Sequence, residues 1–267
     1  MLSVRRKSIN KYLKIAEISL TNRLAYLSDH LASSLFLLLI LFIFAQLWQT
    51  ILQNGQIAGF NKVQMLWYMV FTEVIALSTP STHRAINQEV KSGDIAYKLT
   101  RPYSYPLYYF FSHCGEFVVR FITNLAIGGT FAYLMMGSIE IQWQFLGWWM
   151  LGLFLAVTIM FLLYFALALL AFWLEDNTPF LWIFSKMTFI FGGLFVPVEA
   201  YPEALRLISY ILPLRYGVSA PARLAISFDH QFFRQMLTGQ VIWVVLLSTI
   251  VATMYRKGVK RINVNGG

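Results

Sequence analysis

Four charged side chains stand inside long apolar stretches of the chain and are its first candidates for chemistry: Glu73, Glu116, Arg120 and Lys186. A charge at the centre of a bilayer costs at least ~2.5–3.5 kcal/mol on insertion scales, so each needs a partner or water. Glu116 and Arg120 share one side of a helix, in the order that favours an ion pair. They either line a substrate pathway or satisfy each other, with Lys186 reaching toward the interface. Glu73 has no basic neighbour in sequence and is the sharper candidate for a functional or inter-helix role.

The chain contains none of the patterns by which an enzyme or a metal site is usually recognised. It has no Gly-x-x-x-x-Gly-Lys-Ser/Thr phosphate loop and no His-Glu-x-x-His pattern. Its four histidines lack metal-ligand spacing, and its one cysteine, Cys114, excludes an intrachain disulfide. We therefore predict no catalytic residue, no metal site and no cofactor bound by this chain. An intramembrane hydrolase is disfavoured because no nucleophile–base pair is visible.

The composition indicates an integral membrane protein. Of the 267 residues, 58% are hydrophobic and only 12% are charged, about half the share of a soluble domain. The mean hydropathy is +0.61. A soluble domain of this size cannot hide so much apolar surface, whereas a bilayer can. These values exclude a disordered protein, a disulfide scaffold and an ordinary cytosolic enzyme.

Six apolar stretches are long enough to cross a bilayer, which takes roughly 20 residues. They are residues 31–52, 63–82, 113–136, 146–173, 179–198 and 238–256. No alternating pattern runs long enough for a barrel, and helices are the other way to satisfy backbone groups in lipid. The sequence thus predicts an all-α membrane protein, with residues 1–267 forming one transmembrane domain.

The basic residues predict the orientation. The formal charge is +9, and most of the 21 Lys and Arg residues fall before the first span, in the loop 83–112 and after the last span. That asymmetry favours two cytoplasmic termini, with the chain in a bacterial plasma (inner) membrane and against anionic lipids. Nucleic-acid binding is disfavoured because the charges flank hydrophobic spans. No cleavable signal is visible, since the first apolar run begins only at residue 31.

Two segments outside the spans have apolar character of their own. Residues 1–30 carry a helical stripe, which predicts an amphipathic helix in the cytoplasmic interface or, alternatively, a cytoplasmic helix packed on a partner. The stripe consists of Ile9, Tyr12, Leu13, Ala16, Leu20, Leu24 and Leu27. The external segment 199–237 is also rich in apolar residues, and Pro202, Pro213 and Pro221 divide it. It is predicted to form short re-entrant helices.

Two motifs give the chain a resemblance to a known family. The loop after the second span has the pattern Glu-x-x-x-Gly-x-Ile…Leu-x-Arg-Pro, formed by Glu89, Gly93, Ile95, Leu99, Arg101 and Pro102. After the fifth span come Gly192, Gly193, Pro197, Glu199, Pro202 and Pro213, expected to form an external gate. With the six spans, these motifs resemble the membrane subunit of ABC-2 type ABC transporters, with the architecture of type V exporters.

The resemblance implies partners and a mechanism. Two permease copies, or this chain and a paralogous permease, are expected to form the substrate pathway. A separate ATP-binding subunit in two copies is expected to hold ATP and Mg and to drive a coupling helix within residues 85–102. Glu89, Lys91 and Asp94 are then candidates to pair with charges on that partner, although the loop can also be read as an ordinary basic loop.

The predicted function is therefore that of an ATP-driven exporter permease, with no ATPase activity of its own. Its substrate is expected to be amphipathic (a lipid, a glycolipid or a drug) or a polysaccharide. The alternative is an ATP-independent secondary transporter or channel, for which no clear internal repeat is visible.

Overall fold

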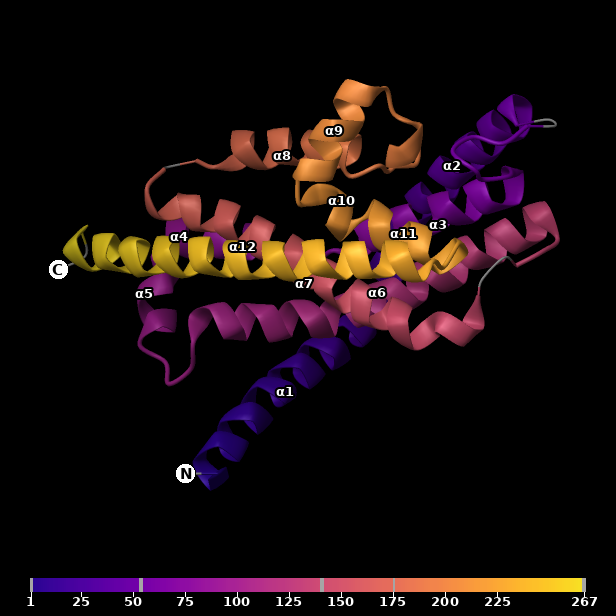
Figure 1. Ribbon diagram of the computed structural model, residues 1–267. Helices are drawn as coiled ribbons and strands as arrows, with labels where there is room; N and C mark the ends of the chain where they lie inside the picture. The colour runs from indigo at the N-terminus through magenta and orange to yellow at the C-terminus, as the bar shows by residue number, and fades with distance from the viewer. Residues whose placement is uncertain (1, 53–54, 140–141, 175, 266–267) are drawn as a thin grey trace.

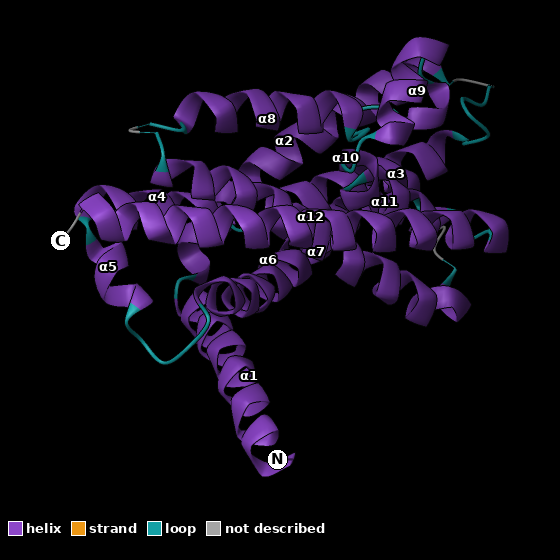
Figure 2. Cartoon of the chain, turned by 60° about the vertical axis from the view of Figure 1, so that its left-hand side comes forward, coloured by secondary structure: helices purple, strands orange, loops and turns teal. Residues whose placement is uncertain are grey.

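The computed structural model describes residues 2–52, 55–139, 142–174 and 176–265, without the side chains of residues 2–8, 27–33 and 262–265. The regular structure of that part is helical, apart from one isolated bridge between Ile57 and Phe60 (Figure 2). The α-helices are α1 Leu2–Ala25, α2 Leu27–Ile51, α3 Lys62–Ser78, α4 Thr82–Ser92, α5 Asp94–Leu99, α6 Tyr105–Met136, α7 Leu146–Leu169, α8 Thr178–Phe191, α9 Glu203–Ile211, α10 Leu214–Gly217, α11 Ser219–Ile226 and α12 His230–Asn265. The 3₁₀ turns are η1 Trp143–Phe145, η2 Leu170–Phe172 and η3 Val198–Ala200.

The long helices α6, α7 and α12 run alongside one another and form the body of the molecule (Figure 1). Helices α4 and α5 gather with the C-terminus at one end of this body, on the left in Figure 1. Helix α8 forms a separate layer above α4 and α12, and α1 lies obliquely against α6, with its N-terminal end extending beyond the other helices. The all-α architecture agrees with the prediction from the sequence.

Four helical stretches in the described part are long and apolar enough to cross a membrane. They are Ser34–Ile51, Tyr105–Met136, Trp143–Phe172 and His230–Arg261. Helix α8, which begins one residue before the fifth predicted span, is apolar but has only 14 residues. The count of six crossings therefore stays a prediction, with α3 and α8 as the two shorter members.

Helix α3 is enclosed by protein and includes polar residues. Twelve of its 17 residues are buried, on every side of the helix, between α2, α6 and α11. Thr72 is fully buried and Glu73 is 3% exposed. A helix enclosed by other helices needs no lipid-facing stripe, so it can contain polar groups that a lipid-facing helix cannot.

Two helices begin earlier than the hydropathy pattern indicates. Helix α6 begins at Tyr105 instead of residue 113, with Pro106 in its first turn, where the missing N–H costs nothing. Helix α12 begins at His230 instead of residue 238, because the Asp229 carboxylate accepts the backbone N–H of Phe232 at 2.7 Å. The predicted loop 83–112 is thus mostly helix, and the predicted external segment 199–237 overlaps the start of α12. A proline in the first turn of α6 and the Asp229 cap of α12 mark these boundaries, and apolarity does not.

The predicted interfacial helix is present as α1, and it docks on the chain's own α6. Tyr12 is buried against α6, whereas Ile9 and Leu13 from the same predicted stripe are more than half exposed. The closest approach is at Gly115, where an added Cβ atom would lie 2.2 Å from the backbone oxygen of Ala16. Glycine at residue 115 therefore allows the two helices to touch.

We expect Gly115→Ala to displace α1 from α6, because the new methyl group meets backbone and not a flexible side chain. Overpacking of this kind costs about 1–3 kcal/mol and should lower the thermal unfolding temperature in detergent. Hydrogen exchange of the α1 amides should speed up. The matched control is Gly147→Ala in α7, where nothing lies within 4 Å of the new methyl group. Equal behaviour of the two variants would contradict the docking described here.

Candidate functional site

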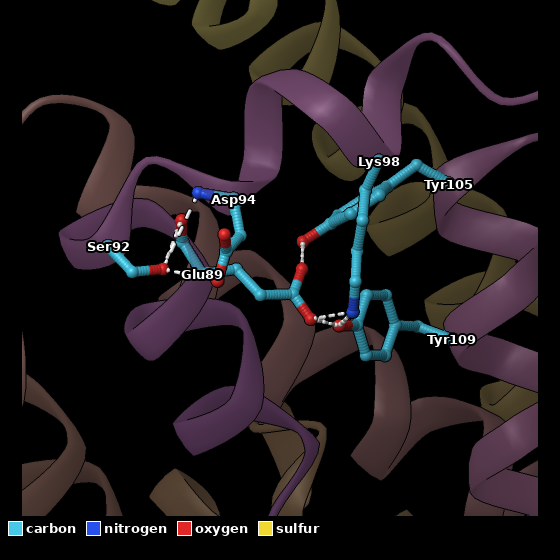
Figure 3. A network of polar contacts seen from close by, with 6 residues as sticks. All are labelled: Glu89, Ser92, Asp94, Lys98, Tyr105 and Tyr109. Carbon is cyan, nitrogen blue, oxygen red and sulfur yellow. Dashed lines mark hydrogen bonds and ion pairs between the residues drawn. The ribbon is translucent and has the colours of Figure 1, made fainter.

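A sharp corner joins α4 to α5 at the end of the bundle near the C-terminus (Figures 1 and 3). Gly93 adopts a left-handed conformation with φ of +79°, which ends α4 and starts α5. The Ser92 hydroxyl donates a hydrogen bond to Asp94 Oδ2 at 2.8 Å across this turn. The corner turns the chain back toward α6 within a few residues.

A buried carboxylate fixes the inner side of the corner. Glu89 is only 7% exposed, and three side chains from two other segments donate to it. Tyr105 bonds its Oε2 at 2.8 Å, while Lys98 and Tyr109 both bond its Oε1 (Figure 3). Since Glu89 belongs to α4, Lys98 to α5 and both tyrosines to α6, the network ties three helices together. We call these four residues the corner network.

The outer side of the corner is exposed. Asp94 and Arg101 face solvent, and the Arg101 guanidinium lies 4.6 Å from the centre of the Tyr97 ring. Tyr97 is 65% exposed. Leu99 packs inward. An exposed aromatic ring stacked on a guanidinium is a typical anchor for another protein.

The corner is also tied to α1. The ammonium group of Lys11 donates to the backbone oxygen of Pro102 at 3.0 Å. The hydroxyl of Tyr12 accepts the backbone N–H of Ser104 at 3.0 Å. The loop between α5 and α6 is therefore held by α1 on one side and by the corner network on the other.

The predicted coupling residues thus separate into two groups. Gly93, Asp94, Arg101 and Pro102 are exposed, whereas Glu89 and Leu99 point into the protein. The idea that Glu89 pairs with a charge on a partner needs correction, because its oxygens are already bonded internally. Sequence reasoning missed Tyr97, Lys98, Tyr105 and Tyr109. The spacing of Tyr105 and Tyr109, one helical turn apart, is a signal that could have indicated those two residues.

A second region is a cavity of about 490 Å³ between the α3–α4 bend, α7 and α8. Its lining is half polar, and it includes His83, Arg84, Asn87, Tyr164, Trp182 and Ser185. His83 stacks on Tyr164 with ring centres 4.9 Å apart. Within the described residues, His83 Nδ1 and Asn87 Oδ1 are buried without a hydrogen-bond partner. Buried polar atoms are normally paired, so these two have hydrogen-bonding capacity that the described side chains leave unused.

The loop between α7 and α8 is bonded to α4 beside this cavity. Asn87 donates to the side-chain oxygen of Asn177, whose own amide donates to the backbone of Leu167 at 2.9 Å. Lys91 lies 3.6 Å from Asp176. The side-chain and backbone hydrogen bonds from Thr178 lower the pKa of Asp176, and Lys91 lowers it further. The contacts join α4, which leads into the corner, to α8 on the other side of the cavity.

The four intramembrane charges do not line this cavity. Arg120 bonds Glu116 with Nη2 at 2.5 Å, and Arg23 of α1 lies 3.9 Å from the same carboxylate oxygen. Of the two interpretations given for Glu116 and Arg120, this geometry matches the one in which they satisfy each other. Lys186 is exposed and lies 5.5 Å from the Trp182 ring. Glu73 is buried one helical turn from Ala76, a cavity residue, and within the described part its carboxylate has no hydrogen bond or ion pair.

The predicted external gate begins at a tight turn after α8. Gly193 has φ of +73°, and an added Cβ atom would lie 2.8 Å from Val198. The Tyr68 hydroxyl donates to the Gly193 backbone oxygen at 2.5 Å. Thr72 donates to the Leu194 backbone oxygen at 3.2 Å. Two polar groups of α3 therefore hold this turn.

The rest of the predicted gate follows this turn. Gly192 and Pro197 are buried beside it, and Pro202 and Pro213 precede α9 and α10. Glu199 accepts a hydrogen bond from Arg223 of α11 at 2.6 Å. Arg215 is buried, with its guanidinium 3.7 Å from the centre of the Tyr210 ring. Helices α10 and α11 pack on α3 and α7, so the segment returns into the bundle.

The described residues form a bundle of apolar helices with a half-polar cavity and a cross-linked corner, which is the architecture of a multi-helix membrane protein. The comparison with protein families identifies which kind. The model of the ABC-2 family transporter proteins matches residues 32–266, and the chain belongs to that family. A search of curated proteins gives no significant match.

Family membership makes the chain a multi-pass membrane permease of an ABC transporter. Permeases of this family are transport components and not catalysts, and they generally work with ATP-binding subunits. This favours the ABC transporter over the ATP-independent transporter or channel considered from the sequence. The match extends over both the corner and the cavity.

The corner network can be tested with a double-mutant cycle of Glu89→Gln and Lys98→Met. Removing one partner of a buried ion pair costs about 3–5 kcal/mol, and we expect about 3 kcal/mol because Lys98 stays partly exposed. The double variant should lose less than the sum of the single variants. Thermal unfolding and hydrogen exchange of residues 94–104 measure both effects. Asp94→Asn is the exposed control, and an additive cycle would show that Glu89 and Lys98 do not interact.

Proposed function

We propose that this chain is the transmembrane subunit of an ATP-driven exporter that works as a dimer. In this proposal a separate ATP-binding subunit, present in two copies, holds ATP and Mg and docks on the corner formed by α4 and α5. The second permease is another copy of this chain or a paralogue. The observation that carries the proposal is the corner itself, which is rigid on its inner side and exposed on its outer side.

The corner has the properties that force transmission needs. An element that receives a push must be connected stiffly to what it moves, because a flexible loop absorbs the displacement. The corner network ties α5 to α4, and α4 continues across the bend at Pro80 into the wall of the cavity. A displacement of α5 would therefore reach His83 and Asn87 through one short helix.

The cavity suits an amphipathic substrate. Its polar half offers hydroxyl, amide and imidazole groups, and its other half offers apolar and aromatic surface, including Tyr164 and Trp182. Arg84 adds a positive charge to the lining. This chemistry fits a lipid, a glycolipid, an amphipathic drug or a segment of polysaccharide. Glu73 lies one turn deeper and extends the polar path further into the bundle.

The proposed location is a bacterial plasma membrane with both termini in the cytoplasm. The basic residues gather at the end of the bundle that includes α4, α5 and the C-terminal part of α12, which supports a cytoplasmic position for that end. The ATP-binding subunit would then meet the corner from the cytoplasm.

The experiment that tests the proposal is a gentle detergent purification of the chain from its native membrane. Mass spectrometry identifies what accompanies it, and an ATPase assay with vanadate follows. A stoichiometric ATP-binding subunit with vanadate-sensitive activity is expected, and the ratio of permeases distinguishes a homodimer from a heterodimer. A lone oligomer without an ATPase would overturn the proposal.

We expect Tyr97→Ala to weaken binding of the ATP-binding subunit without loss of the folded chain. A central aromatic anchor of an interface contributes about 2 kcal/mol, which is roughly a thirtyfold loss of affinity. The loss of affinity is measured as the amount of ATP-binding subunit retained on immobilised permease. The control is Tyr133→Ala, since Tyr133 is equally a tyrosine and half exposed but belongs to the far end of α6. If both variants retain the ATPase equally, α5 is not the docking element.

A bulky residue in the cavity should block transport while leaving ATP hydrolysis intact. Ser185→Trp places a large ring among the residues that line the cavity. The control is Ile183→Trp, because Ile183 lies on the opposite side of α8 and is 53% exposed. Substrate stimulation of the ATPase should disappear in the first variant only, with basal hydrolysis unchanged in both. Unaltered stimulation in Ser185→Trp would remove the cavity from the substrate path.

A further inference from the structure

A second large cavity lies on the other side of the body, as a groove of about 430 Å³ between α6, α7 and α12. Its walls are almost entirely apolar, with Leu107, Phe110, Phe161, Leu162, Val251 and Ala252 among the lining residues. It shares no lining residue with the half-polar cavity. A volume of this size is within the usual range of ligand sites.

The groove has a direction that follows from the order of its lining residues. Ser104 precedes the first turn of α6, and Arg256 lies in the part of α12 nearest the C-terminus. These two residues mark the end of the groove beside the corner. Thr158 of α7 and Ser248 of α12 mark the other end, deeper in the bundle. The groove therefore runs along the helices, from the end of the bundle toward its middle.

The mouth of the groove is positively charged. Arg256 lines it, and Lys257, Lys260 and Arg261 follow on the same helix. Arg256 and Lys260 are exposed, and in the described part of the chain neither makes an ion pair. Lys260 is one helical turn beyond Arg256, so both point to the same side of α12. None of the lining residues is acidic.

We propose that this groove binds one acyl chain of an anionic phospholipid, with the lipid phosphate at Arg256 and Lys260. Apolar walls of this length attract a hydrocarbon chain, and a polar head cannot enter them. Basic pockets between membrane helices select anionic head groups, with about 1 kcal/mol for each Lys or Arg near the surface. The lipid belongs to the leaflet at the corner end of the bundle, and the site is separate from the substrate cavity.

The groove is also in contact with the corner network. Tyr255 lines the groove, and its ring stacks on Tyr105 with centres 6.1 Å apart and planes within 8°. Tyr105 in turn donates to Glu89. A bound chain beside Tyr255 therefore supports the side of the network that faces the membrane. The lipid is a resident component in this arrangement and not cargo.

The test uses the purified full-length chain and vesicles of phosphatidylcholine mixed with phosphatidylglycerol. After release in mild detergent, native mass spectrometry counts the lipids that remain bound. We expect the wild type to retain phosphatidylglycerol in preference to phosphatidylcholine. Arg256→Gln should lower phosphatidylglycerol retention about fivefold, the factor expected for one basic side chain. Lys257→Gln is the matched control, because it removes the same charge from another side of α12 and should change nothing.

A second variant separates the groove from general surface charge. Ala252→Phe fills the groove and should abolish retention of either lipid, with thermal unfolding without lipid as the control for folding. Glycerol phosphate, which carries the charge but no acyl chain, should not compete. Equal losses in Arg256→Gln and Lys257→Gln, or full retention in Ala252→Phe, would overturn the proposal.

The occupant can also be identified directly. A photoreactive side chain at residue 252 should label phospholipid in the native membrane, and labelling of a second polypeptide there would overturn the proposal. None of these measurements needs an ATPase or a substrate, so they test the lipid site independently of the exporter function.

Discussion

The carboxylate of Glu89 organises the end of the molecule at which the chain changes direction most sharply. A single buried charge is costly by itself, and it is tolerated here because an ammonium group and two phenol hydroxyls all donate to it. These three hydrogen bonds are made together only when α4, α5 and the first turns of α6 are placed as they are here, so the network favours that arrangement. Through the loop at Pro102 and Ser104, the same arrangement also determines where α1 lies.

The enclosed position of α3 has a comparable effect on the rest of the bundle. Because other helices surround it, α3 can offer Tyr68 and Thr72 to the backbone of the turn after α8. It can also contain the buried carboxyl group of Glu73, which makes no hydrogen bond or ion pair within the described part of the chain. Lipid-facing helices such as α2 have no such freedom and expose Leu35 and Phe36 instead. Buried polar residues thus lie on α3 and on α4, which follows it, whereas helices such as α2 present apolar residues on the outside.

Much of this architecture could be predicted from residue types alone. Long apolar runs predict spanning helices, and the spacing of Glu116 and Arg120 predicts their ion pair, since both signals are local. The corner network could not be predicted, because it joins Glu89 to residues of two other helices that only the fold brings together. The half-polar cavity escaped detection for the same reason: its lining comes from three separated segments, and none carries a recognisable motif. The early start of α12 depended on a single cap, Asp229, that hydropathy does not register.

The docking of α1 has a consequence for how the protein is made. The hydrogen bonds of Lys11, Tyr12 and Ser19 connect α1 to residues that follow it by 91 to 93 positions. At a ribosomal rate of about 5–20 residues per second, α1 emerges several seconds before the surface that receives it exists. During that interval the α6 residues that cover Tyr12 have not yet been synthesised, and the membrane surface is an apolar phase on which α1 can lie. In this order of synthesis, α1 binds the membrane surface before α6 is inserted. A delay in the insertion of α6 would leave α1 on the membrane surface without its docking partner.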